Sequence, residues 1–112
     1  MLTQSNFLRS SKIKHIVFWQ LKDEALGNTK ARNMELVKEK LMACADIVPG
    51  IVDFEVGLGG TSLECTYDVV LYSTFENKAA LDAYQVHPQH EAIKSFIGEV
   101  RSARQCMDYE VI

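Results

Sequence analysis

Two segments of the chain are apolar at consecutive positions, and this feature constrains the fold more than any other. "KIKHIVFWQL" (residues 12–21) and "TYDVVLYSTF" (residues 66–75) are rich in β-branched and aromatic residues and predict strands. Successive side chains of a strand point to opposite faces of its sheet, so the runs 16–19 and 69–72 put apolar groups on both faces. Helices that pack on one face of such a sheet therefore leave a second apolar face uncovered.

The first helix and the second strand are predicted from periodicity and turn residues. Asn28 or Thr29 can cap a helix over residues 30–46. Its apolar stripe, with spacings of three and four, consists of Met34, Val37, Leu41, Cys44 and Val48. A proline–glycine pair ends this helix, and "IVDFEVGL" (residues 51–58) predicts a strand. Its alternating apolar side is Val52, Phe54, Val56 and Leu58.

The second half of the chain repeats this order. Asn77 can cap a helix that carries Tyr84, and Pro88 interrupts that helix because proline lacks the amide hydrogen that a helix interior needs. Proline is favoured in a first turn, so a new helical segment starts there. "CMDYEVI" (residues 106–112) predicts a fourth strand. The result is an α+β fold, a ferredoxin-like βαββαβ sandwich whose four-stranded antiparallel sheet carries its helices on one face.

The uncovered face predicts a partner. Ile16, Phe18, Val70 and Tyr72 would form a contiguous apolar patch there, of the size that marks an interaction surface. A homodimer through this open sheet face is the most economical cover, because the same patch serves both subunits around a two-fold axis.

Composition excludes several classes of partner. The 12 basic and 15 acidic residues give a net charge of −3 without a basic block, so we expect no nucleic acid partner. The apolar run at 16–19 is too short to span a membrane. Three cysteines form no C-x-x-C pair, which favours a reducing compartment, and we expect a cytoplasmic protein. We also expect a disordered leader over residues 1–11 and one domain over 12–112.

The three histidines are the candidate chemical groups. His87 precedes Pro88, and its favoured role is to start a helix. His90 has two interpretations: a general base assisted by a hydrogen bond from Tyr84 to an oxyanion, or a structural residue bonded to His15 or to backbone. Three imidazoles can bind zinc, but no carboxylate is obviously placed to support them. We therefore predict neither a metal nor a cofactor.

Four segments together resemble a known family: "IKHIVFWQLKDEA", "VPGIVDFEVG", "YDVVLYSTFENKAALDAYQVHPQH" and "MDYEV". In order and spacing they are similar to the stress-responsive A/B barrel domain (Dabb, or dimeric α/β barrel) family. The resemblance implies a subunit whose sheet pairs with a second copy to form an α/β barrel. Most members have no assigned chemistry, although one plant member, olivetolic acid cyclase, closes a polyketide chain in a cavity between sheet and helices.

This resemblance also implies site residues. The catalytic pair of the cyclase corresponds to Tyr84 and His90. The expected lining of a ligand cavity is His15, Val17, Trp19, Val37, Leu41, Phe54, Val69, Leu71 and His87. At Val37, Leu41 and Val69 this chain departs from the cyclase, which has aromatic residues and a histidine there, so the same substrate is not expected.

Three functions remain open from the sequence. The first is a dimeric barrel domain of unassigned activity that binds a small apolar ligand. The second is a lyase or cyclase that acts on a small carbonyl compound through Tyr84 and His90. The third is a purely structural or interaction protein in which the histidines only pack. The room beside His90 separates the second from the third.

Overall fold

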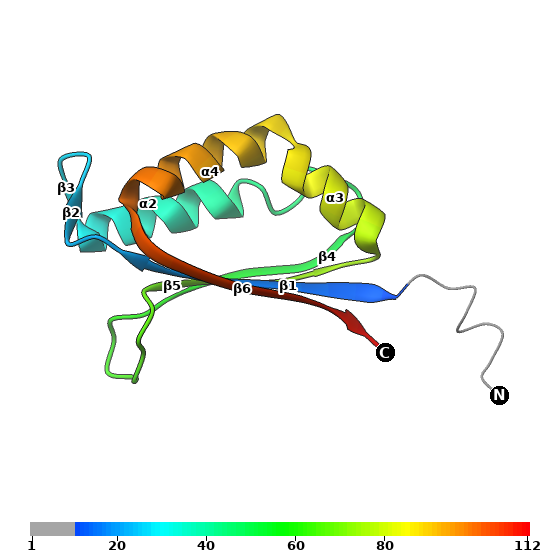
Figure 1. The fold of residues 1–112 in the computed structure, drawn as a ribbon, viewed down its shortest axis with the longest axis horizontal. Coiled ribbons are helices and arrows are strands. Elements are labelled where there is room, and N and C mark those ends of the chain that lie inside the picture. Colours follow the sequence, from blue (N-terminus) through cyan, green and yellow to red (C-terminus); the bar gives the residue numbers. More distant parts are fainter. Residues whose placement is uncertain (1–10) are drawn as a thin grey trace, which may run out of the picture.

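A four-stranded antiparallel sheet and a layer of helices form the fold in the computed structural model, which describes residues 11–112 (Figure 1). The strands are β1 (Lys12–Leu21), β4 (Ile51–Leu58), β5 (Val69–Phe75) and β6 (Arg101–Val111), in the spatial order β4-β5-β1-β6. The helices are α2 (Lys30–Met42), α3 (Lys78–Val86) and α4 (Pro88–Val100), all on one face of the sheet. The predicted ferredoxin-like α+β sandwich is confirmed. Residues 1–10 of the predicted leader lie outside the described residues.

The two central strands alternate as their sequences predict. In β1 every odd position from Ile13 to Leu21 is buried against the helices, and Phe18 on the other side is 41% exposed. β5 behaves in the same way: Val69 and Leu71 are buried, and Tyr72 faces outward. Each strand therefore presents apolar groups to the helices and to the open face, by which we mean the face of the sheet opposite the helices.

The helix boundaries follow local capping chemistry. The hydroxyl oxygen of Thr29 accepts a hydrogen bond from the amide of Arg32, which caps α2. Asn77 caps α3 in the same way, through the amide of Ala80. His87 has extended backbone angles between α3 and α4, and its Nδ1 accepts from the amide of Gln89 at 3.1 Å. The predicted helix-starting role of His87 is therefore what the structure shows.

Three local details in the first half of the chain differ from the predictions. Helix α2 ends at Met42, and turns replace the predicted last helical turn as far as residue 46. A two-residue turn with positive φ at Leu26 and Gly27 joins a small hairpin, β2 (Glu24–Ala25) and β3 (Asn28–Thr29), that was not predicted. Val52 was expected on the core side, but this is wrong: a register shift between residues 51 and 53 leaves Val52 44% exposed.

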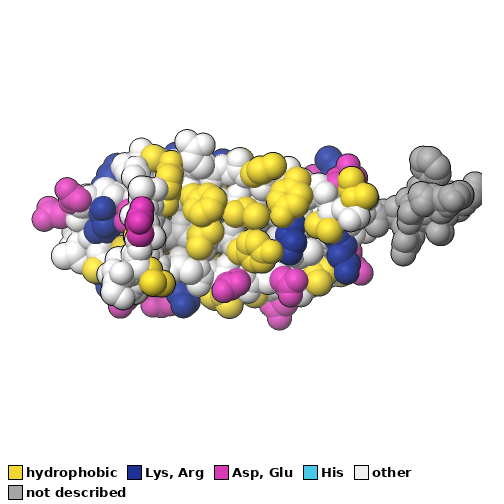
Figure 2. Space-filling view, turned by 90° about the horizontal axis from the view of Figure 1, so that it is seen from below, with side chains coloured by type: hydrophobic (Ala, Val, Ile, Leu, Met, Phe, Trp, Pro, Cys, Tyr) yellow, Lys and Arg dark blue, Asp and Glu magenta, His cyan; other side chains and the backbone are white. Residues whose placement is uncertain are grey.

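The open face carries the predicted apolar patch, and β6 enlarges it. Figure 2 shows hydrophobic side chains gathered over the middle of this face. Ile16 of β1 lies between Tyr72 of β5 and Met107 of β6 in the strand register. Met107 is 64% exposed.

None of the helices that the structure describes is long and apolar enough to cross a membrane.

Candidate functional site

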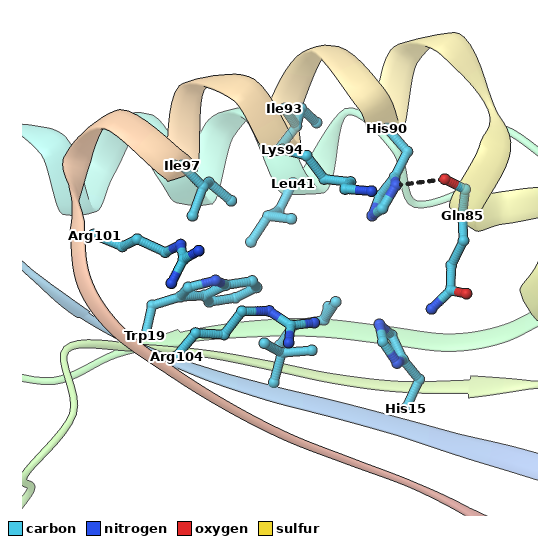
Figure 3. Close-up of a pocket in the computed structure, with 13 residues that line it drawn as sticks. His15, Trp19, Leu41, Gln85, His90, Ile93, Lys94, Ile97, Arg101 and Arg104 are labelled. Carbon is cyan, nitrogen blue, oxygen red and sulfur yellow. Dashed lines mark hydrogen bonds between the residues drawn. The ribbon is translucent and has the colours of Figure 1, made fainter.

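A cavity of about 450 Å³ lies between α4 and the helix-facing side of β1 and β6 (Figure 3). This volume is in the range of small-molecule sites. Strands β1, β5 and β6 contribute its floor, and α4 its roof. Its lining consists of His15, Val17, Trp19, Leu41, Leu71, Gln85, His90, Ile93, Lys94, Ile97, Gly98, Arg101 and Arg104.

His15 is held in this cavity by a carboxylate. It is 4% exposed, and its Nδ1 lies 2.5 Å from Oδ1 of Asp108, the residue opposite it on β6. A carboxylate oxygen accepts hydrogen bonds, so the Nδ1–H of His15 donates to Asp108 and the bond orients the ring. The hydroxyl of Ser73 on β5 donates to the His15 carbonyl at 2.7 Å. Both neighbouring strands therefore fix this histidine.

His90 is the second imidazole of the cavity. It lies in the first turn of α4, and its Nδ1 is 3.1 Å from the backbone oxygen of Gln85, to which it donates. Burial lowers the pKa of His90 below its ordinary value of 6.5; Lys94 and His15 add to the lowering, and the Gln85 carbonyl opposes it. His90 is therefore neutral at pH 7 and has a free Nε2.

Tyr84 packs behind His90 and does not line the cavity. The two ring centroids are 4.5 Å apart, so the structure brings together the pair that the sequence singled out. Tyr84 is fully buried, and its hydroxyl has no hydrogen-bond partner within the described residues. Burial, with a smaller contribution from Cys44, raises the pKa of this hydroxyl well above its usual value of 10. The catalytic role of the pair stays a prediction.

The structure gathers only part of the predicted lining. Five of the nine predicted ligand-binding residues line the cavity, together with His90: they are His15, Val17, Trp19, Leu41 and Leu71. The other four do not line it. Val37 is buried in the core, and Phe54 packs on Tyr84 with ring centroids 6.0 Å apart. Val69 lines a separate surface pocket, and His87 caps α4.

Several lining residues were missed. Ile93 and Ile97 lie on the predicted apolar face of the second helical segment, and Lys94 and Gly98 follow them at the same helical spacing. That pattern could have identified the roof. Arg101 and Arg104 could not be found, because the fourth strand was predicted to start at residue 106.

The histidines do not form a metal site. His87 turns away to cap α4, so the three imidazoles do not converge. Among residues 11–112 no group of three histidine, cysteine or acidic side chains is placed to hold a metal ion. The expectation that no carboxylate supports these histidines is wrong, because Asp108 binds His15.

A family model supports the interpretation of this fold. The model of the stress responsive A/B barrel domain, Dabb, matches residues 13–111. The chain belongs to the Dabb family. This match covers all four strands of the main sheet and the helices packed on it.

Solved structures share the fold of this Dabb domain. A dimeric protein of unknown function with a ferredoxin-like fold from Bacteroides fragilis is 34% identical, with a TM-score of 0.76, and the match covers 89% of this chain and 96% of that one. A Dabb family protein from Mesorhizobium loti is 24% identical, with a TM-score of 0.65 and coverage of 92% and 99%. The hydroxynitrile lyase from Passiflora edulis is 17% identical, with a TM-score of 0.72 and coverage of 91% and 94%. The comparison with curated proteins gave no match.

Proposed function

We propose that this Dabb domain acts as a homodimer that binds a small, mainly apolar molecule in the cavity between α4 and the sheet. The observation that carries this proposal is the cavity itself, about 450 Å³ in a chain of 112 residues. Apolar walls with a few convergent polar groups are typical of small-molecule sites. Here Trp19, Leu41 and Ile97 supply apolar walls, and His15 and His90 are among the polar groups.

The dimer rests on the open face. Apolar side chains from β1, β5 and β6 gather there, and isolated subunits rarely expose such a surface (Figure 2). The Bacteroides fragilis protein, at 34% identity, is described as dimeric. A two-fold pairing of open faces buries both patches and leaves the cavity, on the helix side, accessible. A cytoplasmic location belongs to the same proposal and fits the exposed free thiols of Cys65 and Cys106.

An enzyme that acts on a small carbonyl compound is the second candidate. The observation that favours it is that two imidazoles line one cavity, and one of them is oriented by a carboxylate. A neutral histidine can remove a proton next to a carbonyl group, and His90 is neutral at pH 7. The likeness to the hydroxynitrile lyase concerns the fold alone. A purely structural protein would need no cavity beside these rings.

The proposed ligand site can be tested by filling it. A Cβ atom added at Gly98 meets nothing within 4 Å, and Gly98 lines the cavity, so we expect the ring of Gly98→Phe to enter it. Ala92→Phe is the matched control, because Ala92 is an exposed residue of α4 outside the lining. Small apolar compounds are screened by the NMR signals of the Trp19 indole and the histidine rings.

We expect compounds that shift these signals in the wild type and in Ala92→Phe to lose binding in Gly98→Phe. Compounds that bind all three proteins equally would place the ligand elsewhere, and a screen without binders would remove the ligand-binding proposal. Turnover of a small carbonyl compound that is lost in His90→Gln or His15→Gln would favour the enzyme.

A further inference from the structure

Three basic residues line the cavity, and among residues 11–112 no acidic side chain does. Lys94 of α4 and Arg101 and Arg104 of β6 are part of its lining; we call these three residues the cationic rim. The protein as a whole has 12 basic and 15 acidic residues, so a surface with basic groups alone is unusual for this chain. Asp108, a carboxylate of β6, is already bonded to His15.

The arginines of the rim form no ion pair with any residue that the structure describes. Among residues 11–112 neither Arg101 nor Arg104 has a carboxylate within 4.0 Å, whereas Arg32 pairs with Glu35 at 3.2 Å. Arg101 follows the C-terminus of α4, where a cation is also favoured by the helix dipole. Arg104 has no such neighbour, and it lies opposite Trp19 in the β6 register. The guanidinium of Arg104 is therefore the clearest indication of the charge of a ligand in this cavity.

The cavity has two unlike ends. Figure 3 shows Arg101 beside Trp19, with the Arg104 side chain extending from there toward the middle, and His15 and Gln85 at the other end, where Lys94 lies near His90. Trp19, Leu41 and Ile97 supply apolar surface within the same lining. Arg104 stands on the helix side of β6, because it pairs with the inward-facing Trp19, so pairing of the open faces would leave it free.

We infer that the ligand of this cavity is an apolar molecule with one anionic oxygen group, a carboxylate or a phosphate, which Arg104 and Arg101 bind at the Trp19 end. Guanidinium groups bind both kinds of anion through paired N–H donors. The apolar body lies on Trp19 and Leu41, and its far end faces the imidazoles of His15 and His90. This inference rests on the proposed ligand-binding function and adds the charge and the orientation of the ligand.

Matched compounds test the charge separately from the apolar body. The set is phenylalkanoic acids of increasing chain length, the amide of each acid, and 4-phenylbutyl phosphate, titrated by calorimetry and by NMR into the full chain. We expect the best acid or the phosphate to bind about tenfold more tightly than the uncharged amide of the same body, as charge-assisted hydrogen bonds require. The preferred head group tells carboxylate from phosphate.

Arg104→Gln should remove most of this preference, because it weakens binding of the charged acid far more than binding of the neutral amide. Arg32→Gln is the matched control, since Arg32 lies outside the cavity lining, and it should keep the preference. Equal affinity of acid and amide in the wild type, or an unchanged preference in Arg104→Gln, would overturn the anionic head and leave the apolar site standing. No shift of the Trp19 indole signal with any member of the set would overturn both proposals.

Discussion

The Nδ1 atom of His15 lies 2.5 Å from Oδ1 of Asp108, although 93 positions separate these residues in the chain. The bond joins β1 to β6 on the helix side of the sheet. The side chain of Asp108 is 41% exposed and that of His15 only 5%, so a buried ring bonds to a carboxylate that also contacts solvent. This pair holds one wall of the cavity in place.

Replacing Asp108 by alanine should therefore destabilise the protein. The buried His15 N–H loses its acceptor, which costs about 1–2 kcal/mol of unfolding free energy, with water replacing part of the lost bond. Urea unfolding at fixed protein concentration measures this loss of stability. It is followed by the fluorescence of Trp19, the single tryptophan of the sequence. Asp108→Asn keeps an acceptor oxygen and should lose less. Equal stability of Asp108→Ala and the wild type would show that the bond contributes nothing.

The stability of the fold should depend on pH through His90. Burial lowers the pKa of His90 in the folded state below 6.5, so the unfolded state binds this proton more readily. The contribution of neutral His90 to stability is fully present above pH 6.5, the ordinary pKa of histidine. It is lost as the pH falls from 6.5 through the lower pKa of His90 in the folded state. We expect the unfolding free energy to decrease over this window, and His90→Gln should make the decrease smaller.

The cause of the lowered pKa can be separated in the same experiment. Burial is its largest cause, and the charge of Lys94 a smaller one. In Lys94→Gln the pKa of His90, measured by NMR titration of its ring, should therefore move toward 6.5 but stay below it. A full return to 6.5 would assign the effect to charge and not to burial.

The element order and the faces of the strands could be predicted because they depend on local period. The double-sided apolar pattern at 16–19 and 69–72 correctly indicated which side chains face the helices and which face outward. Capping by Thr29 and Asn77 and the break at Pro88 also follow from side-chain chemistry within one turn. The fold class needed nothing beyond these signals.

The site needed information that local patterns do not contain. The pair His15 and Asp108 depends on the register between the first and last strands of the sheet, and Arg104 reaches the cavity only because β6 begins at Arg101. The prediction that Val52 faces the core was wrong for a similar reason, since a bulge interrupts the alternation of β4. Register and bulges are set by packing across the sheet, which one sequence does not reveal.

Gly98 should prove dispensable for folding. A glycine inside a helix costs about 0.5–1 kcal/mol relative to alanine, and an added Cβ here meets nothing within 4 Å. Gly98→Ala should therefore raise the melting temperature. Gly50→Ala is the opposite case, because Gly50 has φ +93° and its added Cβ would lie 2.8 Å from the Cβ of Ala80. Thermal unfolding of both variants should show shifts of opposite sign, and a destabilised Gly98→Ala would disprove the open space above the cavity.

The dimer should depend on the open face. Phe18 is a member of the apolar patch, 41% exposed, and lies between Val70 and Gln105 in the register. Phe18→Glu places a charge where the two sheets would meet, and a buried unpaired charge is costly. We expect sedimentation velocity to show a dimer for the wild type and a monomer for Phe18→Glu, with unchanged circular dichroism.

Val86→Glu is the matched control for this experiment. Val86 is 71% exposed, so it carries more accessible apolar surface than Phe18, but it ends α3 in the helix layer. If apolar exposure alone drove association, both variants would dissociate. If the sheet faces pair, only Phe18→Glu does, because the helix layer stays in solvent on both sides of the barrel. A Phe18→Glu protein that remains dimeric would place the interface elsewhere and leave the open face without a partner.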